Sequence, residues 1–141
     1  FGKALASVGA FVVCNKQMRE FLINSMRTLI FTTALPPINL RWSLYILNIL
    51  PKLSKSRIYL KSISDKLRKQ MPVQIGSSHI VPFLIGKSED STRAGLAEQG
   101  FCASAIRPPT VPGGTSRIRF SLSANMPEQE IDRLIETVAK I

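Results

Sequence analysis

The first third of the chain contains a short continuous apolar run and then a periodic apolar pattern, and each predicts a different element. A short apolar run at 8–14 is typical of a buried strand. Apolar residues at 16–29 then recur every three or four positions, as on one face of a helix, and Asn15 suits the cap of that helix. Residues 38–50 are apolar almost all round a helical wheel, with Pro37 at the first position, so we expect a helix buried on more than one side.

Beyond Pro51, which ends or kinks that helix, the pattern predicts a helix and then strand, helix, strand, strand, helix. We expect three helices, one at 52–71, one that is capped by Ser88 and stopped by Gly100, and one at 125–141. We expect strands at 79–85, 101–106 and 117–123. Pro82 inside the first of these strands indicates a sheet edge or a bulge. This order builds a small sheet with helices on one face, so the predicted fold class is α/β.

The connection from Ile106 to Arg119 is the most distinctive stretch. Its three prolines and two glycines predict a stiff, sharply turned loop. In the strand that follows, Ile118, Phe120 and Leu122 share one face, which leaves Arg117 and Arg119 together on the other. Two solvated arginines would give this pattern, and so would a pair placed to bind a carboxylate or a phosphate.

Charge adds a second feature. The chain of 141 residues has a net charge of +10, and residues 41–69 hold most of the excess, with eight Lys or Arg against one acid. A solvated helix face is our preferred interpretation, and a docking surface for a polyanion is the alternative. Because this segment carries no nucleic-acid-binding motif, we expect no nucleic-acid partner.

The remaining composition excludes several classes of protein. The hydrophobic share of 45% and the charged share of 20% are those of a globular protein, and no apolar run approaches the roughly 20 residues of a membrane helix. Cys14, Cys102 and the single histidine, His79, have no metal-site spacing, so we expect no metal and a structural role for the histidine. The thiols favour a reducing, cytoplasmic location.

Four segments in chain order carry a resemblance to a known family. They are FGKAL at 1–5, FTTALPP at 31–37, SHIVP at 78–82 and RPPTVP at 107–112. Together they resemble the α-oxoamine synthases, transferases that depend on pyridoxal phosphate and condense an amino acid with an acyl-CoA. The resemblance covers essentially the whole chain and is weakest from residue 39 to 76.

The resemblance implies a division of the chain. Residues 1–37 would be a remnant of the cofactor-binding large domain of the pyridoxal-phosphate transferases, 38–50 a connecting helix, and 51–141 the small C-terminal α/β domain. Since the chain opens on Phe1 with no initiator methionine, we expect it to be part of a longer protein. The family's other cofactor contacts precede the lysine, so we expect the isolated chain to be inactive.

Lys3 is the residue that the resemblance implies as catalytic and cofactor-binding. It matches the family lysine that binds the aldehyde of pyridoxal phosphate and then acts as general base, which requires an amine with a lowered pKa. The chain departs from the family close by, because Ala6 stands where we expect glycine.

The other site residues are also implied by the resemblance. Arg119 matches the position that holds the amino acid's carboxylate, Arg107 and Thr110 match positions on the acyl side, and Thr32 and Thr33 match hydroxyls that reach the cofactor phosphate across a homodimer interface. The implied substrates are L-alanine and an acyl-CoA.

Two alternatives stay open. RPP at 107–109 favours the branch of the family that uses L-alanine, and a sister branch with another amino acid and acyl group is the nearer alternative. A basic α/β binding module that uses residues 41–69 is the more distant one.

Overall fold

The structure is a computed structural model that describes residues 1–86 and 89–140. Its contacts divide the chain into two compact units, unit 1 from Phe1 to Leu53 and unit 2 from Ser54 to Ile141.

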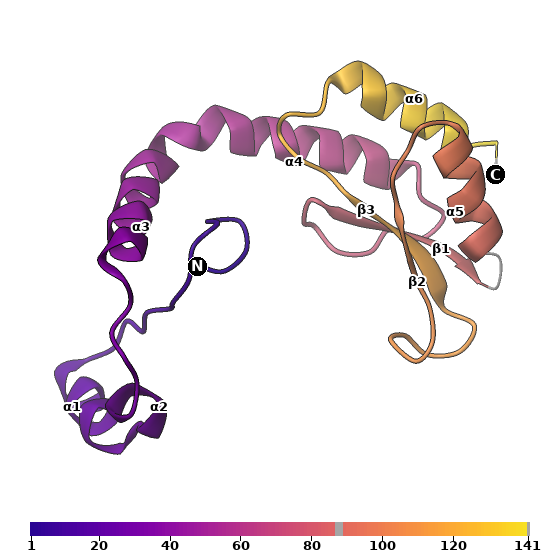
Figure 1. Ribbon diagram of the computed structural model, residues 1–141. Helices are drawn as coiled ribbons and strands as arrows, with labels where there is room; N and C mark the ends of the chain where they lie inside the picture. Colours follow the sequence, from indigo (N-terminus) through magenta and orange to yellow (C-terminus); the bar gives the residue numbers. More distant parts are fainter. Residues whose placement is uncertain (87–88, 141) are drawn as a thin grey trace. The chain divides into compact units, whose positions relative to one another are not determined.

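Unit 1 contains helices and extended segments (Figure 1). Its elements are α1 (Lys16–Ser25), α2 (Arg27–Ile30), α3 (Pro37–Ile49) and the 3-10 turn η1 (Leu50–Leu53). Asn15 caps α1 as predicted, since its Oδ1 accepts the backbone N–H of Met18 at 2.9 Å. Pro37 occupies the first turn of α3, and the 3-10 turn at Pro51 ends that helix, so both proline predictions are confirmed.

Two predictions for unit 1 are wrong. Residues 8–14 form no strand and are not buried, with Phe11 66% and Val13 86% exposed. The apolar ring of α3 is not buried either, because Ser43 is its only buried residue. A strand needs a paired neighbour and an apolar helix needs an opposing layer, and the described residues of unit 1 supply neither.

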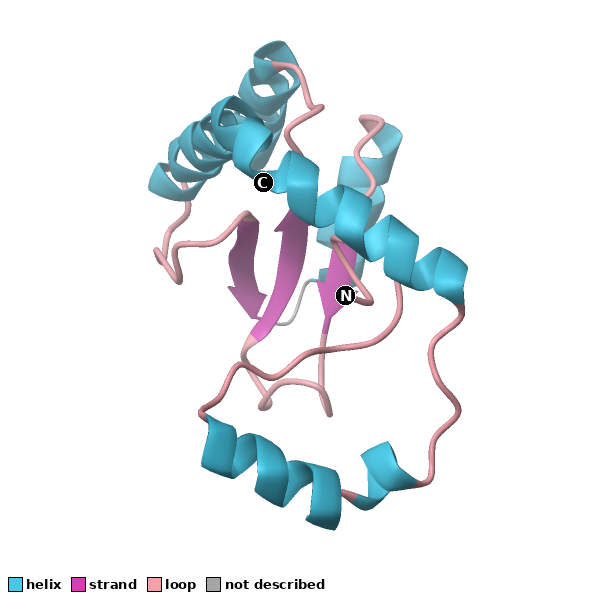
Figure 2. Ribbon diagram, turned by 90° about the vertical axis from the view of Figure 1, so that its left-hand side faces the viewer, coloured by secondary structure: helices cyan, strands magenta, loops and turns pink. Residues whose placement is uncertain are grey.

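Unit 2 is a three-stranded antiparallel sheet with helices (Figure 2). Its elements are α4 (Ser54–Lys69), β1 (Ile80–Gly86), α5 (Glu89–Glu98), β2 (Ser104–Ile106), β3 (Ser116–Ser121) and α6 (Glu128–Val138). The strand order is β1-β3-β2, so the strand with Pro82 lies at an edge, as predicted. The α/β prediction is confirmed.

The core of unit 2 follows the alternation of its strands. Val81 lies opposite Phe120 and Phe83 opposite Ile118, so these buried side chains share one face of the sheet. The helices α4, α5 and α6 cover that face with Ile63, Leu67, Leu96, Ile131, Leu134 and Val138. The other face of the sheet is thereby left to polar and partly exposed residues.

The connections of unit 2 explain where its elements end. Gly100, at φ +82°, stops α5 as predicted, with the N–H of Phe101 donating to the carbonyl of Leu96 at 2.8 Å. The strand predicted at 101–106 is shorter than expected, since β2 begins at Ser104. Phe101, which precedes it, has its ring centroid 4.7 Å from Cζ of Arg133. Ser88, the predicted cap of α5, lies outside the described residues.

Candidate functional site

The outer face of the sheet in unit 2 carries both arginines of β3. Arg119 lies opposite Pro82 of β1 on one side and Ser104 of β2 on the other. Arg117 lies opposite Leu84 and Ile106, two residues and about 7 Å along the strand. Because β3 is the central strand, each guanidinium is attached to backbone that is hydrogen-bonded on both sides.

The two arginines differ in what they contact. The guanidinium of Arg117 donates from Nε to the carbonyl of Thr115 at 3.1 Å and from one terminal nitrogen to Thr115 Oγ1 at 3.2 Å. Arg119 is exposed, and its side chain makes no hydrogen bond or ion pair within residues 1–86 and 89–140. Arg119 therefore has all its N–H groups available for a ligand, and Arg117 is committed to the loop before it.

The loop from 107 to 115 is held by its own backbone. Thr110 N–H donates to the carbonyl of Arg107 at 3.0 Å, and both the N–H and the hydroxyl of Thr115 donate to the carbonyl of Pro112, at 3.2 and 2.8 Å. These hydrogen bonds are consistent with the stiff loop that the prolines predict. Arg107 directly follows Ile106, the residue opposite Arg117, so the loop with Arg107 and Thr110 leaves the sheet beside the two arginines.

In unit 1, Lys3 lies in a tight turn that α3 holds in place. Ala6 N–H donates to the carbonyl of Lys3 at 2.9 Å, which closes the turn. Trp42 Nε1 donates to the carbonyl of Leu5 at 3.0 Å, and the hydroxyls of Ser7 and Ser43 hydrogen-bond at 3.0 Å. The Lys3 side chain is exposed and has no hydrogen bond or ion pair among the described residues.

Thr32 and Thr33 follow α2 in the extended segment that leads to α3. Both are exposed, and Thr32 Oγ1 donates to the carbonyl of Thr33 at 3.2 Å. The same segment packs on the stretch after the Lys3 turn, since a Cβ added to Gly9 would lie 2.5 Å from Leu35 Cδ1. Unit 1 therefore joins the lysine turn and the threonine segment through the contact between Gly9 and Leu35.

The predicted site residues thus fall into two groups, one in each unit. Lys3, Thr32 and Thr33 lie in unit 1, and Arg107, Thr110 and Arg119 lie in unit 2. Their roles stay predictions.

Sequence reasoning missed the residues that hold these groups. Ser43 and Trp42 fix the lysine turn from 36 and 37 residues away, and no local pattern marks such pairs. Thr115 was also missed, although it precedes Arg117 by two residues, a spacing at which a side chain can reach a neighbouring backbone oxygen.

No helix in the described part of the chain has the length and apolar character needed to cross a membrane.

Comparison with known families identifies the class of protein. The family described as aminotransferase class I and II matches residues 1–138. The chain belongs to this family.

Curated relatives narrow the similarity further. The chain is 42% identical over 142 residues to the 8-amino-7-oxononanoate synthase of Haemophilus ducreyi, and the match covers 96% of this chain. It is 50% identical over 137 residues, 93% of its length, to a Neisseria meningitidis protein that carries the same name provisionally. The chain spans about a third of these relatives, 37% and 36% of their lengths.

Solved structures agree in fold. The 8-amino-7-oxononanoate synthase of Francisella tularensis superposes with a TM-score of 0.82 at 27% identity, over 99% of this chain and 43% of that one. A serine palmitoyltransferase variant from S. paucimobilis with bound PLP superposes with a TM-score of 0.79 at 25% identity, over 97% of this chain and 37% of that one.

Proposed function

We propose that this chain is the C-terminal portion of an 8-amino-7-oxononanoate synthase. Such an enzyme joins L-alanine to pimeloyl-CoA or another pimeloyl thioester and releases carbon dioxide and the thiol carrier, a step of biotin biosynthesis. The observation that carries the proposal is the 42% identity to the Haemophilus ducreyi enzyme along nearly the whole chain. The exposed Arg119, which lies beside the hydrogen-bonded loop from 107 to 115, supports it. An arginine can bind the carboxylate of the amino-acid substrate.

Pyridoxal phosphate is the cofactor that we propose, and the residues present fit it. The aldehyde of the cofactor needs an accessible amine to react with. The Lys3 side chain is exposed and makes no hydrogen bond or ion pair among the described residues. A phosphate accepts hydrogen bonds from hydroxyls. Thr32 and Thr33 are both exposed, and the Thr33 hydroxyl makes no hydrogen bond among the described residues. When bound, this cofactor withdraws electrons from the α-carbon of an amino acid.

The chain's own residues have distinct tasks in this proposal. Arg119 would hold the substrate carboxylate with two parallel N–H···O bonds and so orient the α-carbon. Lys3 would take the proton from that carbon, since a neutral amine close to the α-carbon can act as a base. Arg107 and Thr110 would line the acyl side of the site, and the hydrogen bonds within the loop from 107 to 115 support this proposal because they order the loop.

We also propose a homodimer in which Thr32 and Thr33 serve the cofactor of the other subunit. The cytoplasm is the proposed location, because Cys14 and Cys102 are both free and exposed and a reducing compartment preserves such thiols.

A sister enzyme is the second candidate, and the similarity to serine palmitoyltransferase structures supports it. Glycine C-acetyltransferase and aminolevulinate synthase are further sisters. These enzymes differ in their amino acid and acyl-CoA, so a panel of L-alanine, glycine and L-serine against pimeloyl, acetyl, succinyl and palmitoyl thioesters separates them. Preference for any pair other than L-alanine and the pimeloyl thioester would replace our proposal.

The activity test uses a chimera in which this chain replaces the aligned segment of the Haemophilus ducreyi enzyme, with thiol release as the assay. We expect turnover of L-alanine with pimeloyl-CoA. Arg119→Lys removes the bidentate contact and should raise KM for L-alanine about tenfold to a hundredfold. Arg133→Lys, an exposed arginine on α6, is the matched control and should change KM little.

A further inference from the structure

The basic segment of the chain forms one wall of a cavity in unit 2. The cavity has a volume of about 200 Å³ and lies between α4 and the loop that leads into β1. Its polar lining comprises Arg57, Lys61, Ser64, Ser77, Ser78 and His79. The residues from α4 recur at spacings of three and four, so they occupy one face of that helix.

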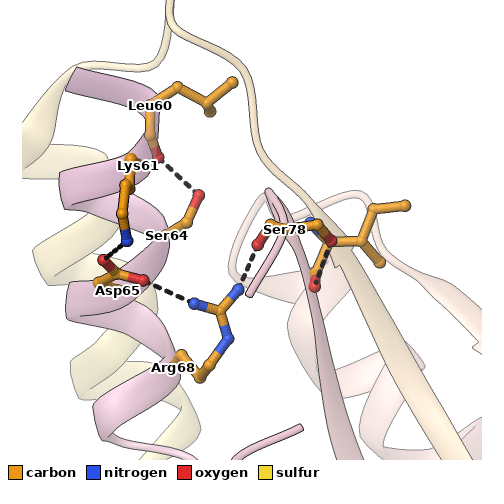
Figure 3. A network of polar contacts seen from close by, with 7 residues as sticks. Leu60, Lys61, Ser64, Asp65, Arg68 and Ser78 are labelled. Carbon is orange, nitrogen blue, oxygen red and sulfur yellow. Dashed lines mark hydrogen bonds and ion pairs between the residues drawn. The ribbon is translucent and has the colours of Figure 1, made fainter. Parts of the chain in front are cut away.

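The wall of this cavity is fixed by a buried arginine (Figure 3). Arg68 is only 7% exposed, donates to Asp65 Oδ1 at 2.8 Å and reaches across to the carbonyl of Ser78. Ser78 Oγ accepts the backbone N–H of Ile80 at 3.2 Å, which ties the loop to the start of β1. The two walls are therefore held at a set separation without a ligand.

The charge around the cavity is positive. Arg57 and Lys61 in the lining and Arg68 beside it bring three positive charges, and the one carboxylate among them, Asp65, pairs with Lys61 at 2.6 Å and with Arg68 at 2.8 Å. The net charge of these four side chains is therefore +2. Ser77 and His79 add polar side chains that make no hydrogen bond within the described residues. Two cations with a hydroxyl and an imidazole are the groups that bind a doubly charged tetrahedral anion.

We propose that this cavity binds a phosphate monoester or inorganic phosphate. Arg57 and Lys61 would neutralise the dianion from the helix side, and Ser77 and His79 would donate from the loop side. Free phosphate and the 3′-phosphate of coenzyme A share this chemistry and are the two sources to distinguish. The site uses none of the residues assigned to catalysis, so it stands or falls independently of the proposed enzyme activity.

The single histidine of the chain provides the readout. We would titrate the isotope-labelled 141-residue chain with inorganic phosphate at constant pH and ionic strength and follow the imidazole signals of His79 by NMR. We expect a saturable shift, whose dissociation constant rises about fivefold in Arg57→Gln and again in Lys61→Gln. Lys55→Gln, an exposed lysine on the same helix outside the cavity, should leave the constant within about twofold.

Coenzyme A and dephospho-coenzyme A, which lacks the 3′-phosphate, distinguish the sources. A His79 shift with coenzyme A but not with dephospho-coenzyme A supports the 3′-phosphate of the coenzyme as the ligand. A shift with inorganic phosphate but with neither coenzyme supports the free anion. The proposal is overturned if His79 shows no saturable shift with either, if Lys55→Gln weakens binding as much as Arg57→Gln, or if only duplex DNA shifts the signal. Unchanged thermal midpoints of the three variants establish that the fold is intact.

Discussion

Ala6 has the least favourable backbone conformation of the turn that carries Lys3. Its φ of +47° lies in the left-handed region, where a Cβ crowds the following carbonyl and glycine is preferred. The turn keeps this conformation because Ser43 and Trp42 of α3 hold its far side. The position of the proposed catalytic lysine thus depends on contacts from a distant helix.

Replacing Ala6 by glycine should stabilise unit 1. The substitution relieves the left-handed cost and adds some chain entropy to the unfolded state, for a net gain of about 0.5–1 kcal/mol. Urea unfolding followed by the fluorescence of Trp42, the single tryptophan, measures it, since its indole donates to the turn. Ala10→Gly is the control and should be destabilising, because Ala10 has no positive φ. Equal losses in both variants would exclude strain at Ala6.

The two arginines of β3 show what the sequence predicts at this scale. Alternation correctly predicted that Arg117 and Arg119 share the face opposite Ile118 and Phe120. It could not separate their roles, because Arg117 is distinguished by its bonds to Thr115 and Arg119 by having none in the described chain. Side-chain contacts of this kind depend on rotamers, which residue order does not determine.

At the scale of elements, the end of α4 is joined to the start of β1 by polar contacts as well as by apolar ones. Asp65 accepts from Lys61 at 2.6 Å and from Arg68 at 2.8 Å, and Arg68 continues to Ser78. The hydrogen bond from Lys61 holds the pKa of Asp65 below its ordinary value of 3.8, and Arg68 contributes in the same direction. The ionised carboxylate is therefore the form that stabilises the fold.

This lowered pKa predicts a pH-dependent stability. The contribution of Asp65 is fully present above the unfolded pKa of 3.8 and is lost as the pH falls through the lower folded value. Asp65→Asn should lower the thermal midpoint by a few degrees at pH 7, and the difference from the parent should shrink as the pH falls below 3.8. Glu136→Gln, at an exposed residue of α6, is the control. A difference independent of pH would mean that the charge of Asp65 contributes nothing.

The ends of helices were predicted well where a residue at the end itself determines the boundary. The cap at Asn15, Pro37 in the first turn of α3 and the stop at Gly100 all lie within a few residues of the boundary that they set. The strand predicted at 8–14 was wrong because a strand is stabilised by its neighbours, and the described chain pairs no strand with it. The predicted burial of α3 was wrong for the same reason, since an apolar face is buried only when another layer packs against it.

At the scale of the whole chain, the two units differ in how much apolar surface they bury. The apolar core lies entirely in unit 2. Among the described residues, nearly all large exposed apolar side chains precede residue 54, the exceptions being Ile58, Val73, Ile75 and Ile80. Burial of apolar surface is the main stabilising contribution to folding, so unit 2 should be much the more stable.

Limited proteolysis tests this difference. Trypsin should cut first at exposed residues of unit 1, such as Lys16 and Arg41, and a fragment that begins near Ser54 should accumulate. Chymotrypsin, with sites at Phe11 and Phe31, should leave a fragment of similar extent. Loss of both units at the same rate with either protease would contradict a separate core in unit 2.

The central claim is that the Lys3 amine binds the aldehyde of pyridoxal phosphate. Borohydride reduction of the cofactor-loaded chimera, followed by digestion and peptide mass analysis, tests it most directly. We expect one pyridoxyl group per chain, on the peptide that contains Lys3, and none on that peptide in Lys3→Ala. A label on another lysine, or no label at all, would contradict it.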